Sequence, residues 1–423
     1  MRPSRLLLAA LTALLLAFTG ERADAQVLVA GHGGQAAALA ALQEDPATRA
    51  PEHAAPIAAG VTDASLAAAA ELSERLAGRA LLVLEGGEVR FERYARGWSA
   101  ERPHPLASGT KSFCGVLAAV AIEDGLFASF DEPVHLHLAA WREDEDRRAV
   151  TVRQLLDQSS GLAPTHPALG RRGYGIRDLG PRNAAVRHLR GDEPPPPDRF
   201  AAAAREVPLI AEPGAEFAYG PAHFFAFGAT LEAALAASDR EERTLWDYLR
   251  ARVLVPAGVE VELERFAPDA ADKPGLPGGA HLTAREWARF GRWVQLEGAR
   301  VGDEGEFVRA FEAGVFAPLF ESSARNASYG LGWWLASEAG DAGRVGEGRV
   351  DADATPFEEE MTLGALRDAD GRAIGVAMAA GAGKQRLYLI DGLDLVVVRF
   401  AEQGRDGRAF DDAEFLETLL GLR

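Results

Sequence analysis

The sequence Leu106-Ala107-Ser108-Gly109-Thr110-Lys111-Ser112-Phe113 leads into the largely apolar residues 114–127. This pattern predicts a helix that begins at Ser108. The apolar side chains that are spaced to face a core are Phe113, Val116, Leu117, Val120 and Ala121. Ser108 and Lys111 are three residues apart, so on a helix they lie about one turn apart on the same face. A neutral lysine amine in that place can take the proton from the serine hydroxyl as the oxygen attacks a carbonyl carbon.

Lysine is rare in this chain, which makes its presence at position 111 informative. Of the 45 Lys and Arg residues, only Lys111, Lys273 and Lys384 are lysine. A general base at this position has to be lysine, because arginine keeps its proton in a protein. Burial and the positive end of a nearby helix both lower the pKa of an amine, which favours the free base near neutral pH. Ser108 and Lys111 are therefore a candidate nucleophile and its base, with a chance match to a short motif as the alternative.

Composition and charge indicate a globular protein and argue against some partners. The chain has 423 residues, 48% of them hydrophobic and 26% charged, which is typical of a soluble protein with two or three domains. The net charge of −18 argues against nucleic acid and against an anionic membrane as partners. The single cysteine, Cys114, is predicted to be a buried thiol without an internal disulfide. The sequence shows no metal-ligand cluster, and we expect no cofactor.

The N-terminal residues resemble a targeting segment followed by a leader. Two arginines precede the apolar run 6–18, and Ala23-Asp24-Ala25 is a small-residue cleavage site. Residues 1–25 are therefore predicted to be a secretory signal peptide, so that the mature protein is periplasmic or secreted. The apolar run is short for a membrane span, so we expect no stable span, and a transmembrane anchor is the alternative. Residues 26–60, rich in Ala and Gly, are predicted to be a flexible leader.

Strand patterns occur near both ends of the remaining chain, and helical patterns fill its middle. The strand-like segments are 80–85 and 88–94, joined by Gly86-Gly87, and later 374–380, 387–390 and 393–400. The helical segments are 63–76, 151–157, 222–237, 241–251, 283–297 and 410–420. We therefore predict an α+β domain over 61–423, with an antiparallel sheet built from about 61–107 and 325–423 and a helical part of about 108–324. The loop 163–200 is either a lid over a site or a solvated insertion.

Six short motifs occur in the order in which one hydrolase family has them. They are Ser108-Gly109-Thr110-Lys111; Thr151-Val152-Arg153-Gln154-Leu155-Leu156 with Ser159-Ser160-Gly161-Leu162; Glu212-Pro213-Gly214 leading to Tyr219; Gly279-Ala280-His281-Leu282-Thr283-Ala284; Tyr329-Gly330-Leu331-Gly332-Trp333; and Gly381-Ala382-Gly383-Lys384-Gln385. With these motifs, the chain from about residue 62 to 420 resembles the serine β-lactamase-like hydrolases. That group holds class C β-lactamases, D-alanyl-D-alanine peptidases, family VIII esterases and nylon-oligomer hydrolases. The resemblance implies the β-lactamase/transpeptidase-like fold.

The resemblance also implies a role for each matching residue. Ser108 would be the nucleophile that becomes acylated, and Lys111 would be its base. Tyr219 matches the family tyrosine that lies across from the serine and shuttles its proton, a role that suits a phenol close to a lysine. The oxyanion hole would consist of the backbone amides of Ser108 and Ala382, the residue after Gly381.

Two positions depart from the family pattern. Many members have an Asn two residues after the tyrosine, where this chain has Pro221. Members that act on β-lactams or peptides usually have Lys or His, then Thr or Ser, then Gly before the oxyanion amide, where this chain has Ala379-Ala380-Gly381. Both changes remove groups that hold a substrate amide or carboxylate. Lys384 could replace the missing charge, but we interpret it as a loop residue at the rim of the site.

Three hypotheses about function follow. The preferred one is an exported serine hydrolase that cleaves an ester or amide of a small, largely uncharged acyl group through Ser108, Lys111 and Tyr219. The second is a β-lactamase or a D-alanyl-D-alanine carboxypeptidase. The third is a scaffold that binds a ligand without turnover, which the presence of Ser, Lys and Tyr argues against. The sequence leaves the substrate and the oligomeric state open.

Overall fold

The computed structural model of the chain describes residues 59–95, 97–169, 197–301, 307–308, 310–337, 363–390, 392–402 and 410–423. Three sequence-based expectations fall wholly or largely outside these described residues. They are the signal peptide 1–25, the leader 26–60 and most of the loop 163–200.

A six-stranded antiparallel sheet joins the two ends of the chain, as the sequence predicts. Its strand order is β2-β1-β12-β11-β10-β7. The strands are β1 (Gly78–Glu85), β2 (Glu88–Tyr94), β7 (Trp334–Leu335), β10 (Val376–Gly381), β11 (Gln385–Ile390) and β12 (Leu395–Ala401). The N-terminal β1 lies directly beside the C-terminal β12, with Leu82 opposite Val398. The α+β prediction with a sheet built from both chain ends is confirmed.

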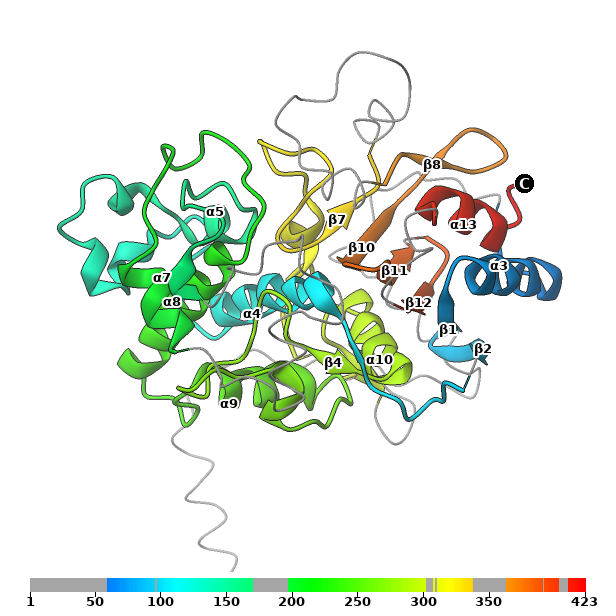
Figure 1. Ribbon diagram of the computed structural model, residues 1–423, viewed down its shortest axis with the longest axis horizontal. Coiled ribbons are helices and arrows are strands. Elements are labelled where there is room, and N and C mark those ends of the chain that lie inside the picture. The colour runs from blue at the N-terminus through cyan, green and yellow to red at the C-terminus, as the bar shows by residue number, and fades with distance from the viewer. Residues whose placement is uncertain are drawn as a thin grey trace, which may run out of the picture.

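Helices cover both faces of this sheet except at the edge strand β2, whose residues are exposed or half-buried. In β1, Leu82 and Leu84 belong to one apolar core while Leu81 and Val83 belong to another, because successive side chains of a strand point to opposite faces. Helices α3 (Asp63–Arg75) and α13 (Asp412–Leu419) pack side by side on one face, at the right of Figure 1. Helix α10 (Ala284–Gln295) packs on the other face, against β1, β11 and β12.

The helical part of the molecule surrounds one buried helix, α4 (Ser112–Glu123). Every side chain from Ser112 to Ala121 is buried, so this helix is enclosed on all sides instead of having one exposed face. Helices α5 (Val152–Leu156) and α8 (Ala222–Ala237) pack against it, as does the π-helical turn over Arg250–Leu254 that continues α9 (Leu245–Leu249). Helix α7 (Arg199–Arg205) packs on α8. Figure 1 shows α4 between these helices and the sheet. Helix α10 lies within the range expected for the helical part but packs on the sheet.

Short strand pairs tie the loops together. They are β3 (His104–Pro105) with β4 (His281–Leu282), β5 (Arg300–Val301) with β6 (Phe307–Val308), and β8 (Leu366–Arg367) with β9 (Ala373–Ile374). Side-chain caps explain where two helices begin later than the sequence suggests. Thr244 accepts from the backbone N–H of Asp247 and starts α9, and Asp411 accepts from that of Glu414 and starts α13.

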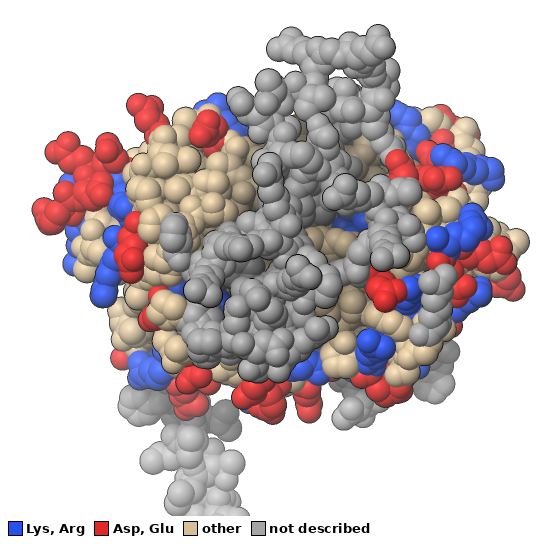
Figure 2. All heavy atoms as spheres, viewed as in Figure 1, with Lys and Arg blue, Asp and Glu red and all other residues tan. Residues whose placement is uncertain are grey.

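The surface carries both signs of charge. Figure 2 shows Lys and Arg side chains interspersed with Asp and Glu around the edge of the face it draws. The acidic run 143–146 is exposed or half-buried, in agreement with a solvated surface. Within the described ranges, none of the helices has the length and apolar character that crossing a membrane requires.

Candidate active site

Ser108 lies on a tight turn that precedes the buried helix. The sequence predicts an α-helix from Ser108, but the structure has a 3-10 helix over Ala107–Lys111, and α4 begins only at Ser112. Ala107 has a φ of 48°, a left-handed conformation that a residue with a Cβ rarely adopts, and this sets the start of the tighter turn. In a 3-10 helix the side chains at i and i+3 lie above one another, so Ser108 and Lys111 face each other more directly than on an α-helix.

A later segment of the chain holds this turn in place. The Thr110 hydroxyl donates to the carbonyl of Ala107 at 2.7 Å and accepts from the backbone N–H of Ala280 at 3.1 Å. The N–H of Leu106 donates to the carbonyl of Ala280 at 2.8 Å. The strained conformation of Ala107 therefore persists because hydrogen bonds on both sides of it fix the backbone.

Lys111 is buried next to Ser108. Its Nζ lies 3.1 Å from the Oγ of Ser108 and 2.8 Å from the carbonyl oxygen of Pro277. The side chain is 4% exposed, and burial lowers its pKa to about 7 because the charged ammonium loses its hydration. Ser108 itself is only half-buried.

This arrangement fits an ammonium, which donates to both oxygens, and it also fits the neutral amine that proton transfer requires. A neutral amine carries two N–H groups and one lone pair, so it can donate to Pro277 and still accept the proton of Ser108. An ammonium would leave no acceptor for the serine hydroxyl. The Ser108–Lys111 pair that the sequence singles out is therefore brought together with a geometry and a pKa that permit proton transfer near neutral pH.

Tyr219 lies against the same lysine. The Nζ of Lys111 is 4.8 Å from the centroid of the Tyr219 ring and 5.5 Å from that of Phe224. On its other sides the Tyr219 ring contacts Trp334 and Tyr329, at centroid distances of 5.7 and 6.3 Å. The structure thus brings Tyr219 to Lys111, and this contact is made by the face of the ring.

Gln158 fixes the backbone on both sides of Tyr219. Its carbonyl accepts from the N–H of Ala218 at 2.9 Å, and its side-chain Oε1 accepts from the N–H of Gly220 at 2.8 Å. Gln158 is fully buried and has a φ of 61°, so its backbone is itself held in an unusual conformation. The sequence analysis did not single out this residue, although it stands directly before the Ser159-Ser160-Gly161-Leu162 motif.

His223 is a second buried group behind Tyr219 that the sequence analysis missed. Its Nε2 lies 2.7 Å from the carbonyl oxygen of Ala218, and its Nδ1 lies 2.8 Å from the Oγ of Ser160. Burial lowers the pKa of His223 to about 4, so the ring is neutral at pH 7. A neutral ring that donates to Ala218 must accept from Ser160, which settles its tautomer. Its place four residues after Tyr219 was the only signal in the sequence.

The end of β10 runs beside the turn that carries Ser108. A Cβ placed on Gly381 would lie 1.9 Å from the carbonyl oxygen of Leu106, so only glycine allows this approach. Ala379, Ala380 and Ala382 around it are all buried. The backbone of Gly381 and Ala382 is thus next to the Ser108 turn, where the family resemblance expects an oxyanion hole.

Lys384 does not lie at the rim of this site, which corrects the interpretation drawn from the sequence. It belongs to the three-residue loop between β10 and β11, but its side chain is buried and its Nζ lies 3.2 Å from a carboxylate oxygen of Asp412 in α13. Helix α13 covers the face of the sheet that α3 also covers. The sequence predicts the short loop. It does not predict that Asp412 of α13 lies under this loop and pairs with the lysine on the face of the sheet that α13 covers.

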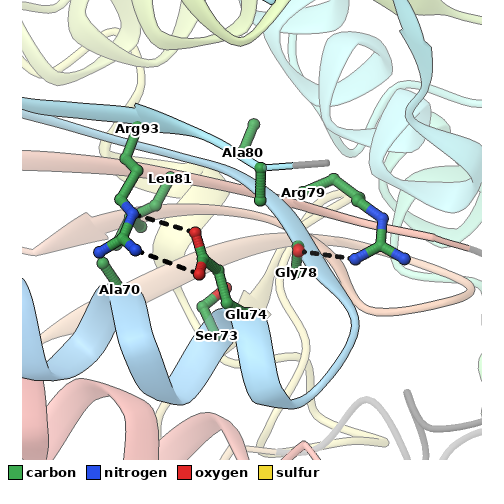
Figure 3. A pocket seen from close by; sticks show the side chains of 9 residues that line it. Ala70, Ser73, Glu74, Gly78, Arg79, Ala80, Leu81 and Arg93 are labelled. Carbon is green, nitrogen blue, oxygen red and sulfur yellow. Dashed lines mark hydrogen bonds and ion pairs between the residues drawn. The ribbon is translucent and has the colours of Figure 1, made fainter. Parts of the chain in front are cut away.

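Two other features of the described residues offer no alternative site. Among the described residues, no group of three or more His, Cys, Asp and Glu side chains could hold a metal ion. The surface pocket in Figure 3 lies between α3 and the start of β1, and the figure shows Arg93 reaching across it to Glu74. In the sheet, β12 and β11 separate β1 from β10, so this pocket is remote from Ser108.

Solved structures with similar folds are hydrolases and related proteins. A D-stereospecific amidohydrolase from Streptomyces sp. has 15% identity and a TM-score of 0.55, with 85% of this chain and 98% of that chain covered. A class C β-lactamase from Rhodobacter sphaeroides has 16% identity and a TM-score of 0.52, with 85% and 98% covered. EstCE1, a hydrolase with promiscuous acyltransferase activity, has 16% identity and a TM-score of 0.53, with 84% and 97% covered. At these identities the likeness shows the fold alone.

The family follows from the sequence as a whole. A comparison with curated proteins found no match. The family model described as Beta-lactamase matches residues 57–410, which include the Ser108 turn, Tyr219 and the end of β10. The fold is the β-lactamase/transpeptidase-like fold that the resemblance implied, and the chain belongs to the β-lactamase family.

Proposed function

We propose that this protein is a serine hydrolase that cleaves an ester or amide of a small, largely uncharged acyl group. Ser108 attacks the carbonyl carbon while Lys111 takes its proton, and an acyl-enzyme forms as the alcohol or amine leaves. Tyr219 passes the proton on to the leaving group. Water then attacks the acyl-enzyme and releases the acid. The backbone amides of Ser108 and Ala382, with Gly381 giving them room, stabilise the oxyanion in both steps.

One observation carries the proposal: the Nζ of a buried lysine lies 3.1 Å from the Oγ of a half-exposed serine. A structural lysine would be expected to pair with a carboxylate, as Lys273 does with Glu232. Lys111 instead contacts a hydroxyl and a carbonyl, and burial lowers its pKa to about 7. A binding scaffold has no need of a deprotonated amine beside a hydroxyl, which favours an enzyme.

The preference for an uncharged acyl group rests on the end of β10. Ala379 and Ala380 offer only methyl groups where relatives that act on β-lactams or peptides usually have a cation and a hydroxyl. Lys384 does not replace the cation, because its amine is held by Asp412. A β-lactamase or a D-alanyl-D-alanine carboxypeptidase is therefore the less favoured function.

The test is a reaction that depends on Ser108. The protein and its Ser108→Ala variant are incubated with short-chain p-nitrophenyl esters and with a fluorophosphonate, and the labelled peptide is identified by mass spectrometry. We expect ester hydrolysis and labelling at Ser108 in the unaltered protein and neither in the variant, with both proteins unfolding at similar temperatures. Hydrolysis that persists in Ser108→Ala would contradict the proposal.

We also propose that the protein is exported and that residues 1–25 are removed. The support is the sequence pattern of a basic start, an apolar run and a small-residue cleavage site. N-terminal sequencing of protein from a bacterial periplasm or culture medium tests this proposal. A first residue at position 26 is the expected result, and an intact N-terminus in the cytosol would refute it.

A further inference from the structure

A fully buried arginine lies behind the proposed oxyanion strand. Arg386 of β11 is 0% exposed, and its Nε and Nη2 donate to the carboxylate of Asp412 at 2.7 and 3.2 Å. Its third nitrogen, Nη1, donates to the carbonyl oxygen of Gly381 at 3.0 Å. The Asp412 carboxylate also accepts from the hydroxyl of Tyr388 at 2.6 Å, so the acidic partner is itself fixed. Arg386 therefore connects the buried carboxylate of α13 to the last residue of β10.

The carbonyl that Arg386 contacts belongs to the peptide unit whose N–H is that of Ala382. In a planar trans peptide the C=O and the N–H point in opposite directions. The Gly381 carbonyl lies on the β11 side of β10, since it accepts from the side chain of Arg386, which stands opposite Ala380 in the register of the two strands. The Ala382 N–H therefore points away from β11. The turn that carries Ser108 is close to this end of β10, because a Cβ on Gly381 would lie 1.9 Å from the carbonyl oxygen of Leu106.

A charged donor on the carbonyl has two effects on such a peptide. It fixes the rotation of the peptide plane, and it draws electron density toward the oxygen so that the N–H becomes a stronger donor. We propose that Arg386, held by Asp412, orients and polarises the Gly381–Ala382 peptide so that the Ala382 N–H stabilises the oxyanion. Arg386 is a positioning residue that acts through Ala382, and this inference rests on the proposed function of Ser108.

The chain offers a matched control on the neighbouring strand. Arg399 of β12 lies directly opposite Arg386 in the sheet and is also 0% exposed. Its guanidinium donates to the Ser73 hydroxyl at 3.0 Å and to the carbonyls of Lys384 and Leu76 at 2.9 and 2.7 Å. It thus supports the same loop without contacting Gly381, so Arg399→Met removes a buried guanidinium but leaves the oxyanion peptide in place.

The experiment compares Arg386→Met with Arg399→Met in the full chain, below the unfolding temperature of both, with active sites counted by p-nitrophenol release. We expect kcat for a p-nitrophenyl ester to fall by roughly 10- to 30-fold in Arg386→Met, with KM nearly unchanged. The loss of a whole oxyanion donor lowers kcat by about 10²–10³-fold, and this variant only weakens and misaligns the donor. The kcat of Arg399→Met should stay within about threefold of the parent value, because its oxyanion donors are intact. Asp412→Asn keeps Arg386 but removes the carboxylate that holds it. This variant should show a smaller fall in kcat, again with KM nearly unchanged.

A spectroscopic signal separates positioning from general damage. When Ser108 carries a fluorophosphonate-derived group, its phosphoryl oxygen occupies the oxyanion hole, and its ³¹P resonance reports the hydrogen bonds there. The resonance should shift in Arg386→Met and in Asp412→Asn but not in Arg399→Met. An unchanged resonance in Arg386→Met, or equal losses of kcat in the Arg386 and Arg399 variants, would overturn the inference. Absence of any Ser108-dependent reaction in the unaltered protein would overturn the proposed function itself, before any variant is compared.

Discussion

The Nζ of Lys111 lies 2.8 Å from the carbonyl oxygen of Pro277, a residue 166 positions later in the chain. This contact fixes the amine at the end of a long, flexible side chain, which would otherwise adopt many rotamers. The segment that supplies Pro277 also supplies Ala280, which holds the turn around Ala107. One loop therefore places both the lysine nitrogen and the serine backbone, so their separation does not depend on the side chain of Lys111 alone.

Lys111→Arg should be nearly as inactive as Lys111→Ala. Arginine keeps the charge and approximately the length of lysine, but it cannot become a free base, so proton transfer from Ser108 is lost. We expect kcat/KM for an ester to fall by roughly 10²–10⁴-fold in both variants. Lys273→Arg is the control, because Lys273 makes an ion pair with Glu232 that an arginine can replace. Turnover of Lys111→Arg within about threefold of the parent would show that Lys111 acts only as a positive charge.

The activity should depend on pH through Lys111. Burial lowers the pKa of this amine from 10.5 to about 7, so the active free base is lost as the pH falls below that value. We expect kcat/KM to fall about tenfold per pH unit below pH 7 and to level off above it. His223 does not account for such a limb, because burial lowers its pKa to about 4. A profile measured from pH 5 to 10 that is flat, or in which kcat/KM rises only above pH 9, would contradict the role given to Lys111.

Tyr219→Phe tests whether the hydroxyl or only the ring is needed. The ring keeps its contacts with Lys111 and Trp334 in this variant, while the hydroxyl that would shuttle the proton is removed. We expect kcat to fall by about 10²-fold with little change in the unfolding temperature. Tyr329→Phe is the matched control, since Tyr329 is a buried tyrosine whose ring contacts that of Tyr219. Equal losses in the two variants would mean that the Tyr219 hydroxyl has no special part in catalysis.

Sequence patterns predicted the parts of this protein that depend on local spacing. The Ser108–Lys111 pair follows from two residues three positions apart on one helical turn. The strands of the sheet follow from the Gly86-Gly87 turn between two strand-like segments and from short apolar runs near the C-terminus. Helix α8 has the bounds that the sequence predicts, 222–237, because its apolar spacing is long and uninterrupted. These features need only near neighbours in the chain to form.

Contacts between distant segments could not be predicted in this way. His223 with Ser160 and Arg386 with Asp412 meet only after the chain has folded, and no spacing in the sequence marks either pair. The same is true of Lys384, whose burial on Asp412 depends on where α13 packs. The start of α4 was misplaced because the left-handed φ of Ala107 is imposed by hydrogen bonds to Thr110 and Ala280, not by the preference of alanine.

Gly381→Ala should damage both stability and activity. The added Cβ would lie 1.9 Å from the carbonyl oxygen of Leu106, so β10 must move away from the turn that carries Ser108. We expect a loss of roughly 1–3 kcal/mol in the free energy of unfolding, as for other overpacked sites, and a fall in kcat of tenfold or more (about the cost of a weakened oxyanion donor). Gly60→Ala is the control, since nothing lies within 4 Å of a Cβ at that position. Full activity in Gly381→Ala would show that the closeness of β10 to Leu106 is not needed for catalysis.

The last prediction concerns the acyl group, and it is motivated by Ala379 and Ala380. If these residues line the acyl site, a carboxylate bound there loses hydration without gaining a partner, which costs a few kcal/mol. That cost lowers kcat/KM by roughly a hundredfold or more. The p-nitrophenyl esters of butyric and succinic acid are similar in size and share one leaving group. The succinate also releases p-nitrophenol spontaneously through attack by its own carboxylate, so this background rate is measured without protein and subtracted. The enzymatic rates then differ mainly through the charge. We therefore expect the butyrate to be cleaved at least about a hundredfold faster than the hydrogen succinate, and penicillins and cephalosporins to react slowly or not at all.

The comparison is informative in both directions. The butyrate and succinate esters require the same attack by Ser108 and the same oxyanion amides, so a general defect in the protein would slow both equally. Ser108→Ala should abolish the enzymatic cleavage of each and leave only the spontaneous release of p-nitrophenol that the succinate's own carboxylate causes, which shows that the ratio belongs to this site. If the succinate ester and a chromogenic cephalosporin are turned over as efficiently as the butyrate, some group in the protein binds the carboxylate. In that case the acyl site is not the apolar one inferred from Ala379 and Ala380, and a β-lactamase or carboxypeptidase would replace the proposed esterase or amidase.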